Sequence, residues 1–141
     1  MSNAAMSLSI NRLSQSDDPR KALLETIGKQ NIDAYRVFED DVLIATYIRP
    51  ERTKGGIFLT DNAKQEDRFQ GKVGLLLKVG CTAFRFDKSG QFAWEGDKPE
   101  VGDWVIYRPS DAWEMSINGV SCRLIRSSLI RGAVSDPTSI W

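Results

Sequence analysis

The sequence predicts an all-β domain, a compact barrel or sandwich, with a short helical extension at its N-terminus. From Tyr35 onward, short apolar runs alternate with turns that contain glycine or proline, as in small β proteins. The length of 141 residues and the apolar fraction of 41% fit one domain with a modest core. We expect a polar leader and a helix in residues 1–34, the β domain in residues 35–134 and a tail in residues 135–141.

A helix is predicted directly before the β domain. Asp18 is a suitable N-cap, Pro19 fits the first turn, and Gly28 is a typical stop. Between them, Leu23, Leu24 and Ile27 recur on one side of a helix. The simpler role for this amphipathic helix is to cover one end of its own domain, and the alternative is to clamp a neighbouring subunit.

The strands are predicted from runs of apolar residues bounded by turns. The segment 83–94 alternates on both sides of the polar turn Asp87-Lys88-Ser89-Gly90 and is the clearest predicted hairpin. Turns are also expected at Val101-Gly102-Asp103 and at Ile117-Asn118-Gly119-Val120. The other expected strands are Val37 to Tyr47, Gly71 to Gly80, Trp104 to Tyr107, Ser121 to Ile125 and Leu129 to Val134.

An apolar triplet preceded by two glycines interrupts the β pattern in residues 48–70. Charged residues flank Gly55-Gly56-Ile57-Phe58-Leu59 on both sides, so this segment has too little apolar surface to fold alone. On an extended backbone Ile57 and Leu59 point to one side and Phe58 to the other, and the glycines permit backbone angles that side chains disfavour. The pattern predicts a mobile arm whose tip docks into a groove. The alternative is an edge strand that packs on its own domain.

The order of these motifs resembles the chaperonin-10 (co-chaperonin, GroES) family. The resemblance covers about Tyr35 to Val134 and depends on Val42-Leu43-Ile44, Gly55 to Leu59, Gly71-Lys72-Val73, Val79-Gly80, Val101 to Tyr107 and Cys122 to Ile125. It implies a small GroES-like β-barrel, assembled into a homo-oligomeric ring, usually a heptamer, through pairing of the first and last strands.

The resemblance also implies roles for single residues. Ile57, Phe58 and Leu59 would bind a chaperonin ring, and Gly55 and Gly56 would be the hinge of the arm. The hairpin residues that would roof the ring are Phe84, Phe86, Phe92 and Trp94. The partner would bind and hydrolyse the ATP, and the lid would enclose a folding client.

The sequence departs from the family pattern in several places. Asp40-Asp41 stands where the family usually has an acidic and then a basic residue, and Phe58 stands where it often has a smaller aliphatic one. The leader, the helix and the tail are extra. Because such proteins also occur in tailed-phage genomes, the alternative function is a virion structural protein, a capsid decoration or connector subunit that clamps capsid proteins with its arm and termini.

An enzyme is the least favoured class. The chain has no histidine, which removes the commonest general base and metal ligand. Carboxylates such as Asp40, Asp41, Glu66 and Asp67 lie at predicted strand or loop boundaries, where solvated charge is expected. No phosphate-binding glycine motif is present. We therefore expect no catalytic residues, no metal and no cofactor.

Composition bears on the partners and the compartment. The 19 basic and 19 acidic residues cancel, which argues against nucleic acid as the main partner. No apolar run is long enough to cross a membrane, and Met1 to Met6 lack the pattern of a signal peptide. Cys81 and Cys122 form no CxxC pair, and both are expected to be small buried residues. A cytoplasmic protein is expected, or a virion component if the alternative holds.

The aromatic residues are expected mainly to pack. Phe84, Phe86, Phe92, Trp94 and Trp104 fall in predicted strands, where core or barrel-end packing is the simplest role. For Trp113 and Trp141, in a predicted loop and in the tail, packing and an interface role stay open.

Overall fold

The computed structural model describes residues 18–49, 71–87 and 89–140. Two helices come first, α2 (Pro19–Ile27) and α3 (Lys29–Asp33). The strands are β1 (Asp41–Thr46), β2 (Val73–Val79), β3 (Trp104–Tyr107), β4 (Trp113–Ile117), β5 (Val120–Arg126) and β6 (Ile130–Val134), with short 3₁₀ turns at Pro109–Asp111, Ser127–Leu129 and Pro137–Ser139. The predicted tip and hinge of the arm, residues 55–59, lie outside the described residues, as do the leader and Trp141.

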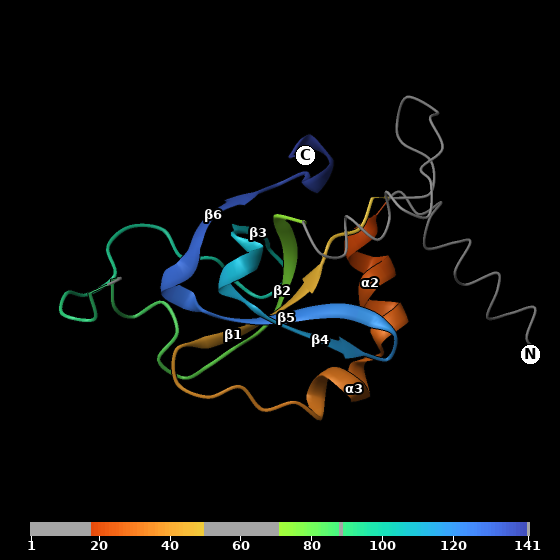
Figure 1. Ribbon diagram of the computed structural model, residues 1–141, viewed down its shortest axis with the longest axis horizontal. Helices are drawn as coiled ribbons and strands as arrows, with labels where there is room; N and C mark the ends of the chain where they lie inside the picture. The colour runs from red at the N-terminus through yellow and green to blue at the C-terminus, as the bar shows by residue number, and fades with distance from the viewer. Residues whose placement is uncertain (1–17, 50–70, 88, 141) are drawn as a thin grey trace, which may run out of the picture.

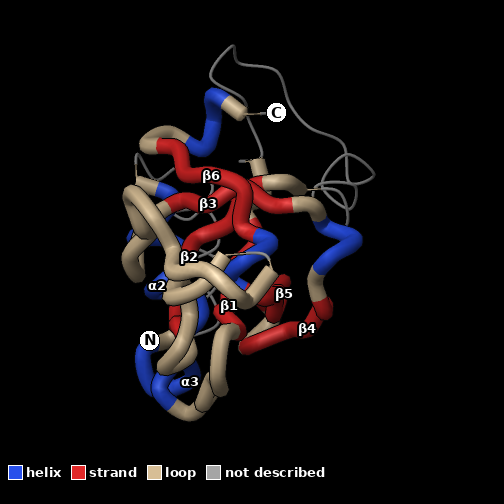
Figure 2. The backbone as a smooth tube through the Cα atoms, turned by 90° about the vertical axis from the view of Figure 1, so that its left-hand side faces the viewer, coloured by secondary structure: helices blue, strands red, loops and turns tan. Residues whose placement is uncertain are grey.

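The six strands form one antiparallel sheet in the order β4-β5-β1-β2-β3-β6. Figure 2 shows them stacked in this order, with β4 and β6 at the two ends. Within the described part of the chain no ladder joins β4 to β6, so these two strands are the edges. The prediction of a small all-β fold with an N-terminal helical extension is confirmed.

Both faces of the sheet are buried. Successive side chains of a strand point to opposite sides, so each strand contributes to two cores. Along β1, Leu43 and Ala45 enter one core and Val42 and Ile44 enter the other. We call the first the helix-side core because it also contains Ile27 of α2 and Ile32 of α3; its other buried members are Tyr47, Val73, Leu75, Leu77, Trp104, Ile117 and Cys122. The second core consists of Val42, Ile44, Leu76, Phe84, Val105, Tyr107, Ile125 and Ile130.

Helix α2 follows the sequence signals closely. Asp18 Oδ1 accepts a hydrogen bond from the backbone N–H of Arg20 (3.1 Å), and Gly28 ends the helix with a φ of 86°. Asn118 Nδ2, from the turn between β4 and β5, donates to the carbonyl oxygens of Thr26 (2.9 Å) and Ile27 (3.3 Å). The helix therefore packs on its own domain, in the simpler of the two roles considered.

The region around Trp113 differs from the prediction. We expected a loop there, but Trp113 begins the edge strand β4, and its side chain is 79% exposed. The turn at Asn118 and Gly119, with φ of 50° and 81°, joins β4 to β5 as a two-residue hairpin. The proline-containing 3₁₀ turn at Pro109–Asp111 obscured the start of this strand in the sequence.

The two cysteines differ in burial, although both were expected to be buried. Cys122 lies in the helix-side core and is fully buried, as predicted. The prediction for Cys81 was wrong, because β2 ends at Val79 and Cys81 lies in the exposed turn that follows. Both are free thiols.

Candidate partner-binding site

The predicted arm leaves the sheet and returns to it on neighbouring strands. Strands β1 and β2 are paired as far as Thr46 opposite Gly74, and the last described residues on the two sides of the arm are Arg49 and Gly71. We call residues 47–49 and 71–73 the root of the arm. The structure places this root, whereas Ile57, Phe58 and Leu59, with Gly55 and Gly56, lie outside the described residues.

A buried polar cluster lies against the root. Arg123 of β5 is only 2% exposed, and its Nη1 donates to the carbonyl oxygen of Gly71 (2.7 Å) and to the hydroxyl oxygen of Tyr107 (3.1 Å). The Ser121 hydroxyl donates to Thr46 Oγ1 (3.4 Å), and both side chains are buried. Burial raises the pKa of Tyr107 above its ordinary value, although the neighbouring Arg123 acts in the opposite direction.

Backbone bonds continue this attachment along the returning strand. The N–H of Tyr107 donates to the carbonyl oxygen of Lys72 (3.0 Å), and the N–H of Tyr47 donates to that of Val73 (3.0 Å). On the helix-side face, the Tyr47 ring makes an edge contact with Trp104 at 5.5 Å between centroids. The root is therefore held from both faces of the sheet. This role of Arg123 could not be recognised from the sequence, since an arginine in a strand is usually solvated.

The predicted roof hairpin is more irregular than expected. Two strands were predicted in residues 83–94, but the described residues of this segment form a single antiparallel bridge, between Phe86 and Ala93. Hydrogen bonds from Asp87 N–H to the Phe92 carbonyl (2.8 Å) and from Trp94 N–H to the Arg85 carbonyl (2.7 Å) close the loop. Figure 1 shows this segment projecting from the sheet on the side away from α2, where no neighbouring strand extends the ladder.

The four aromatic residues of this segment divide into two pairs. Phe84 is buried in the second core, and its ring contacts Trp94 edge to face at 5.3 Å. Phe86 and Phe92 are 51% and 66% exposed, so the expectation that they pack in the core was wrong. The structure thus brings Phe84 and Trp94 together at the base of the loop and leaves two aromatic rings accessible near its tip.

Asp87 organises the tip of this loop. Its Oδ1 accepts hydrogen bonds from the N–H (3.0 Å) and the hydroxyl (2.6 Å) of Ser89. Chiefly because the Ser89 hydroxyl bond stabilises the carboxylate, the pKa of Asp87 lies below its ordinary value. The turn that presents Phe86 and Phe92 is therefore a defined one.

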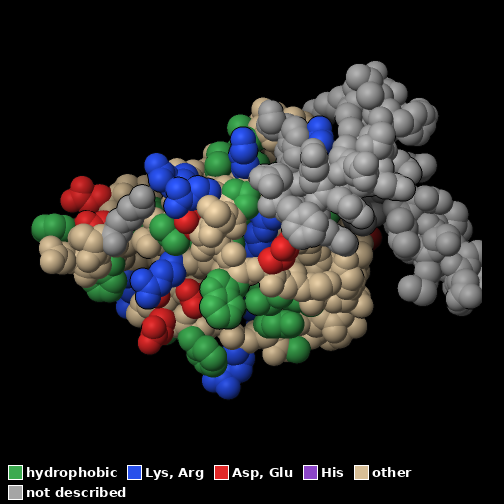
Figure 3. Space-filling model, in the orientation of Figure 1, with side chains coloured by type: hydrophobic (Ala, Val, Ile, Leu, Met, Phe, Trp, Pro, Cys, Tyr) green, Lys and Arg blue, Asp and Glu red, His purple; other side chains and the backbone are tan. Residues whose placement is uncertain are grey.

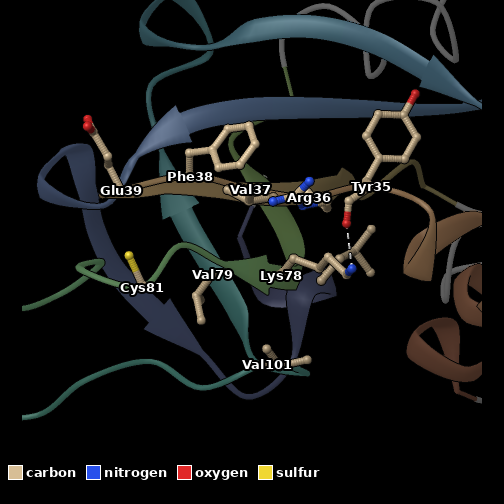
Figure 4. A pocket seen from close by; sticks show the side chains of 10 residues that line it. Tyr35, Arg36, Val37, Phe38, Glu39, Lys78, Val79, Cys81 and Val101 are labelled. Atoms are coloured by element: carbon tan, nitrogen blue, oxygen red, sulfur yellow. Dashed lines mark hydrogen bonds between the residues drawn. The ribbon is translucent and has the colours of Figure 1, made fainter.

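A shallow groove of about 600 Å³ runs beside residues 35–39. Figure 4 shows this segment along one side, with Val79, Cys81 and Val101 on the other. Lys78 Nζ ties the segment to β2 by donating to the Tyr35 carbonyl oxygen (2.6 Å). Phe38, Val79 and Val101 are all exposed. This apolar groove could not be recognised from the sequence, because its residues come from separate segments of the chain.

The described surface combines apolar and charged side chains (Figure 3). Figure 3 shows hydrophobic, basic and acidic side chains intermixed on one face of the molecule. The described residues contain no cluster of three or more acidic or cysteine side chains placed to hold a metal. No helix in the described ranges has the length and apolar character needed to span a membrane.

Comparison with known proteins matches residues 34–134 to the family of the chaperonin 10 kDa subunit. Similar proteins include the co-chaperonin GroES of Rhodobacter capsulatus, 28% identical over 102 residues that cover 72% of this chain and 99% of the relative. The co-chaperonin GroES of Allorhizobium ampelinum is 28% identical over 100 residues, or 71% of this chain and 94% of the relative. The co-chaperonin GroES of Cereibacter sphaeroides is 28% identical over 102 residues, which cover 72% of this chain and 99% of the relative.

Proposed function

Because the chain belongs to the chaperonin 10 kDa subunit family, we propose that it is a co-chaperonin, a ring subunit that docks on an ATP-driven chaperonin and caps its folding chamber. The observation that carries this proposal is that the family match spans residues 34–134, the whole described sheet together with both ends of the arm. The ATP would be bound by the partner. The subunit would act by noncovalent contact, in the cytoplasm.

Docking would use Ile57, Phe58 and Leu59, which follow the paired glycines Gly55 and Gly56. Burying an apolar side chain of this size contributes about 1.5 to 3 kcal/mol, while ordering each backbone residue costs about 1 to 2 kcal/mol. One arm would therefore bind weakly. In a ring the later contacts become intramolecular, so several weak tips together give firm but reversible binding.

Two surfaces support assembly into a ring. Residues 35–38 have no strand partner among the described residues, and they border the apolar groove with Val79 and Val101. At the other end of the described chain, β6 pairs with β3, and no second described strand pairs with it. We propose that the free side of β6 in one subunit pairs with residues 35–38 of the next. Phe86 and Phe92, exposed in the loop between β2 and β3, would lie at the roof of the ring.

Sedimentation of the purified protein with a bacterial chaperonin, with and without ATP, tests the docking proposal. We expect co-migration with the large ring in the presence of ATP. Phe58→Asp should abolish co-migration without changing the oligomer, because the substitution places a charge in the apolar binding groove of the chaperonin. Phe92→Asp makes the same chemical change in an exposed ring outside the arm, and it should leave co-migration intact.

Two results would contradict the proposal. Retained co-migration of Phe58→Asp would remove the predicted tip from the interface. A stable oligomer that ignores both the chaperonin and ATP would refute the co-chaperonin function itself, and would favour the alternative of a virion subunit built on the same fold.

A further inference from the structure

We infer that Arg123 is the positioning residue that fixes the root of the arm to the sheet. The effect of this attachment on docking rests on the proposed co-chaperonin function, but the attachment itself is a property of the isolated subunit. Among the described residues, strand pairing does not reach Gly71, although the Tyr107 N–H still bonds to the Lys72 carbonyl oxygen. The last register pair between β2 and β3 is Val73 opposite Ile106, and Gly71 lies beyond it.

The guanidinium of Arg123 supplies a hydrogen bond to Gly71, where strand pairing has ended. Its Nη1 donates to the Gly71 carbonyl oxygen at 2.7 Å, directly before the carbonyl groups of Lys72 and Val73, which accept from backbone N–H groups. The same nitrogen donates to the Tyr107 hydroxyl at 3.1 Å, and the guanidinium carbon lies 5.6 Å from the centre of the Tyr107 ring. Arg123 is thereby held between β3 and the root.

The burial of this charge argues for a positioning role rather than a stabilising one. Removing a charged group from water is costly, and an apolar side chain of similar size often serves stability as well or better. Arg123 is 2% exposed, and its Nη1 donates to the Gly71 carbonyl oxygen and to the Tyr107 hydroxyl. An apolar side chain would fill the same space but leave the Gly71 carbonyl without this donor.

Detachment of the root would lengthen the segment that must be ordered when the arm docks. Each additional residue to be fixed has an entropic cost, and a longer tether lowers the effective concentration of the tip at its groove. With Arg123 in place, Gly71 would stay fixed to the sheet when the arm docks. We therefore expect Arg123 to set how strongly a ring of arms binds.

Amide hydrogen exchange in the isolated protein tests the inference, with Arg123→Met and Arg123→Lys. The N–H of Tyr107 bonds to Lys72, and the N–H of Tyr47 bonds to Val73, so both report on the root. The N–H groups of Gly80 and Ser127, bonded to Asp41 and Asp40 at the opposite end of β1, are matched controls.

In Arg123→Met we expect exchange at Tyr47 and Tyr107 to accelerate about ten- to hundredfold, because a hydrogen bond to a charged group is lost and the opening is local. Exchange at Gly80 and Ser127 should stay unchanged. Arg123→Lys keeps a donor of similar reach and should give an intermediate rate. Equal acceleration at all four amides would mean a general loss of stability and would overturn the inference, as would no acceleration at all.

Tyr107→Phe keeps the inference testable if Arg123→Met does not fold. It removes one acceptor of the guanidinium but keeps the ring, so acceleration at Tyr47 and at the amide of residue 107 should be smaller but still confined to the root. Failure to bind a chaperonin would refute the proposed function and leave the exchange result standing. If the protein binds a chaperonin but the expected exchange pattern is not observed, only the role of Arg123 is refuted.

Discussion

Replacing Ile27 by alanine tests whether the N-terminal extension is an integral part of the fold. The helix α2 has nine residues, too few to be stable in isolation, so its stability must come from packing. Ile27 is fully buried in the helix-side core together with residues of β1, β2 and β5. The structure therefore predicts that Ile27 is a main anchor of the extension, alongside Ile32 of α3 and the hydrogen bonds from Asn118.

The expected loss follows from the burial of the side chain. The substitution removes three carbon atoms, which corresponds to about 2.4 kcal/mol of transfer free energy at about 0.8 kcal/mol each. With the cavity that remains, the free energy of unfolding should fall by about 2 to 5 kcal/mol. Leu24→Ala is the matched control on the same helix. Leu24 is 39% exposed and outside the buried core, so its replacement should cost less than about 1 kcal/mol.

Urea unfolding followed by tryptophan fluorescence measures both losses, since Trp104 lies in the same core as Ile27. A single transition shifted to lower urea is expected for Ile27→Ala. Similar small losses for Ile27→Ala and Leu24→Ala would refute the reasoning and show that the helix is detachable. The clamp onto a neighbouring subunit would then become the better interpretation of the extension.

Three further outcomes are expected. Gly119→Ala should lower the free energy of unfolding by about 1 kcal/mol, because Gly119 has a φ of 81°. Gly132→Ala is the control and should change the free energy of unfolding little, since an added Cβ would meet Ile106 at an ordinary 3.8 Å. Equal losses for the two variants in urea unfolding would contradict this prediction. Burial and the neighbouring Asp40 raise the pKa of Asp41 above its ordinary value. The native state therefore binds the Asp41 proton more tightly than the unfolded state does. The stability that this proton contributes decreases as pH rises through the pKa of the unfolded state and then through the higher pKa of the native state. Asp41→Asn should therefore gain stability relative to the wild type as pH rises from about 3 to 6, and a constant difference across a pH series of urea titrations would refute it. A thiol reagent should label Cys81 in the native protein but Cys122 only after unfolding, because Cys122 is buried and its pKa is raised to about 12; rapid labelling of both in native buffer would contradict the structure.

Local signals in the sequence were sufficient for the helix and for most strands. Asp18, Pro19 and Gly28 set the limits of α2 through interactions within a few residues. The buried strands β1 and β2 were visible as apolar runs, and the order of motifs was sufficient to recognise the family. The sequence failed at β4, whose side chains are largely exposed and so lack a strong apolar pattern. It also predicted strands in residues 83–94, where alternation is present but no neighbouring strand is available.

The candidate site depends much more on tertiary structure. The apolar triplet at Ile57, Phe58 and Leu59 could be recognised as a candidate tip from the sequence alone, because composition and spacing are local properties. It could not show that Arg123 is buried against Gly71, since the two residues are 52 positions apart and meet only when β5, β1 and β2 lie side by side. Burial and long-range hydrogen bonding are set by strand order, and strand order is decided by the packing of the whole sheet.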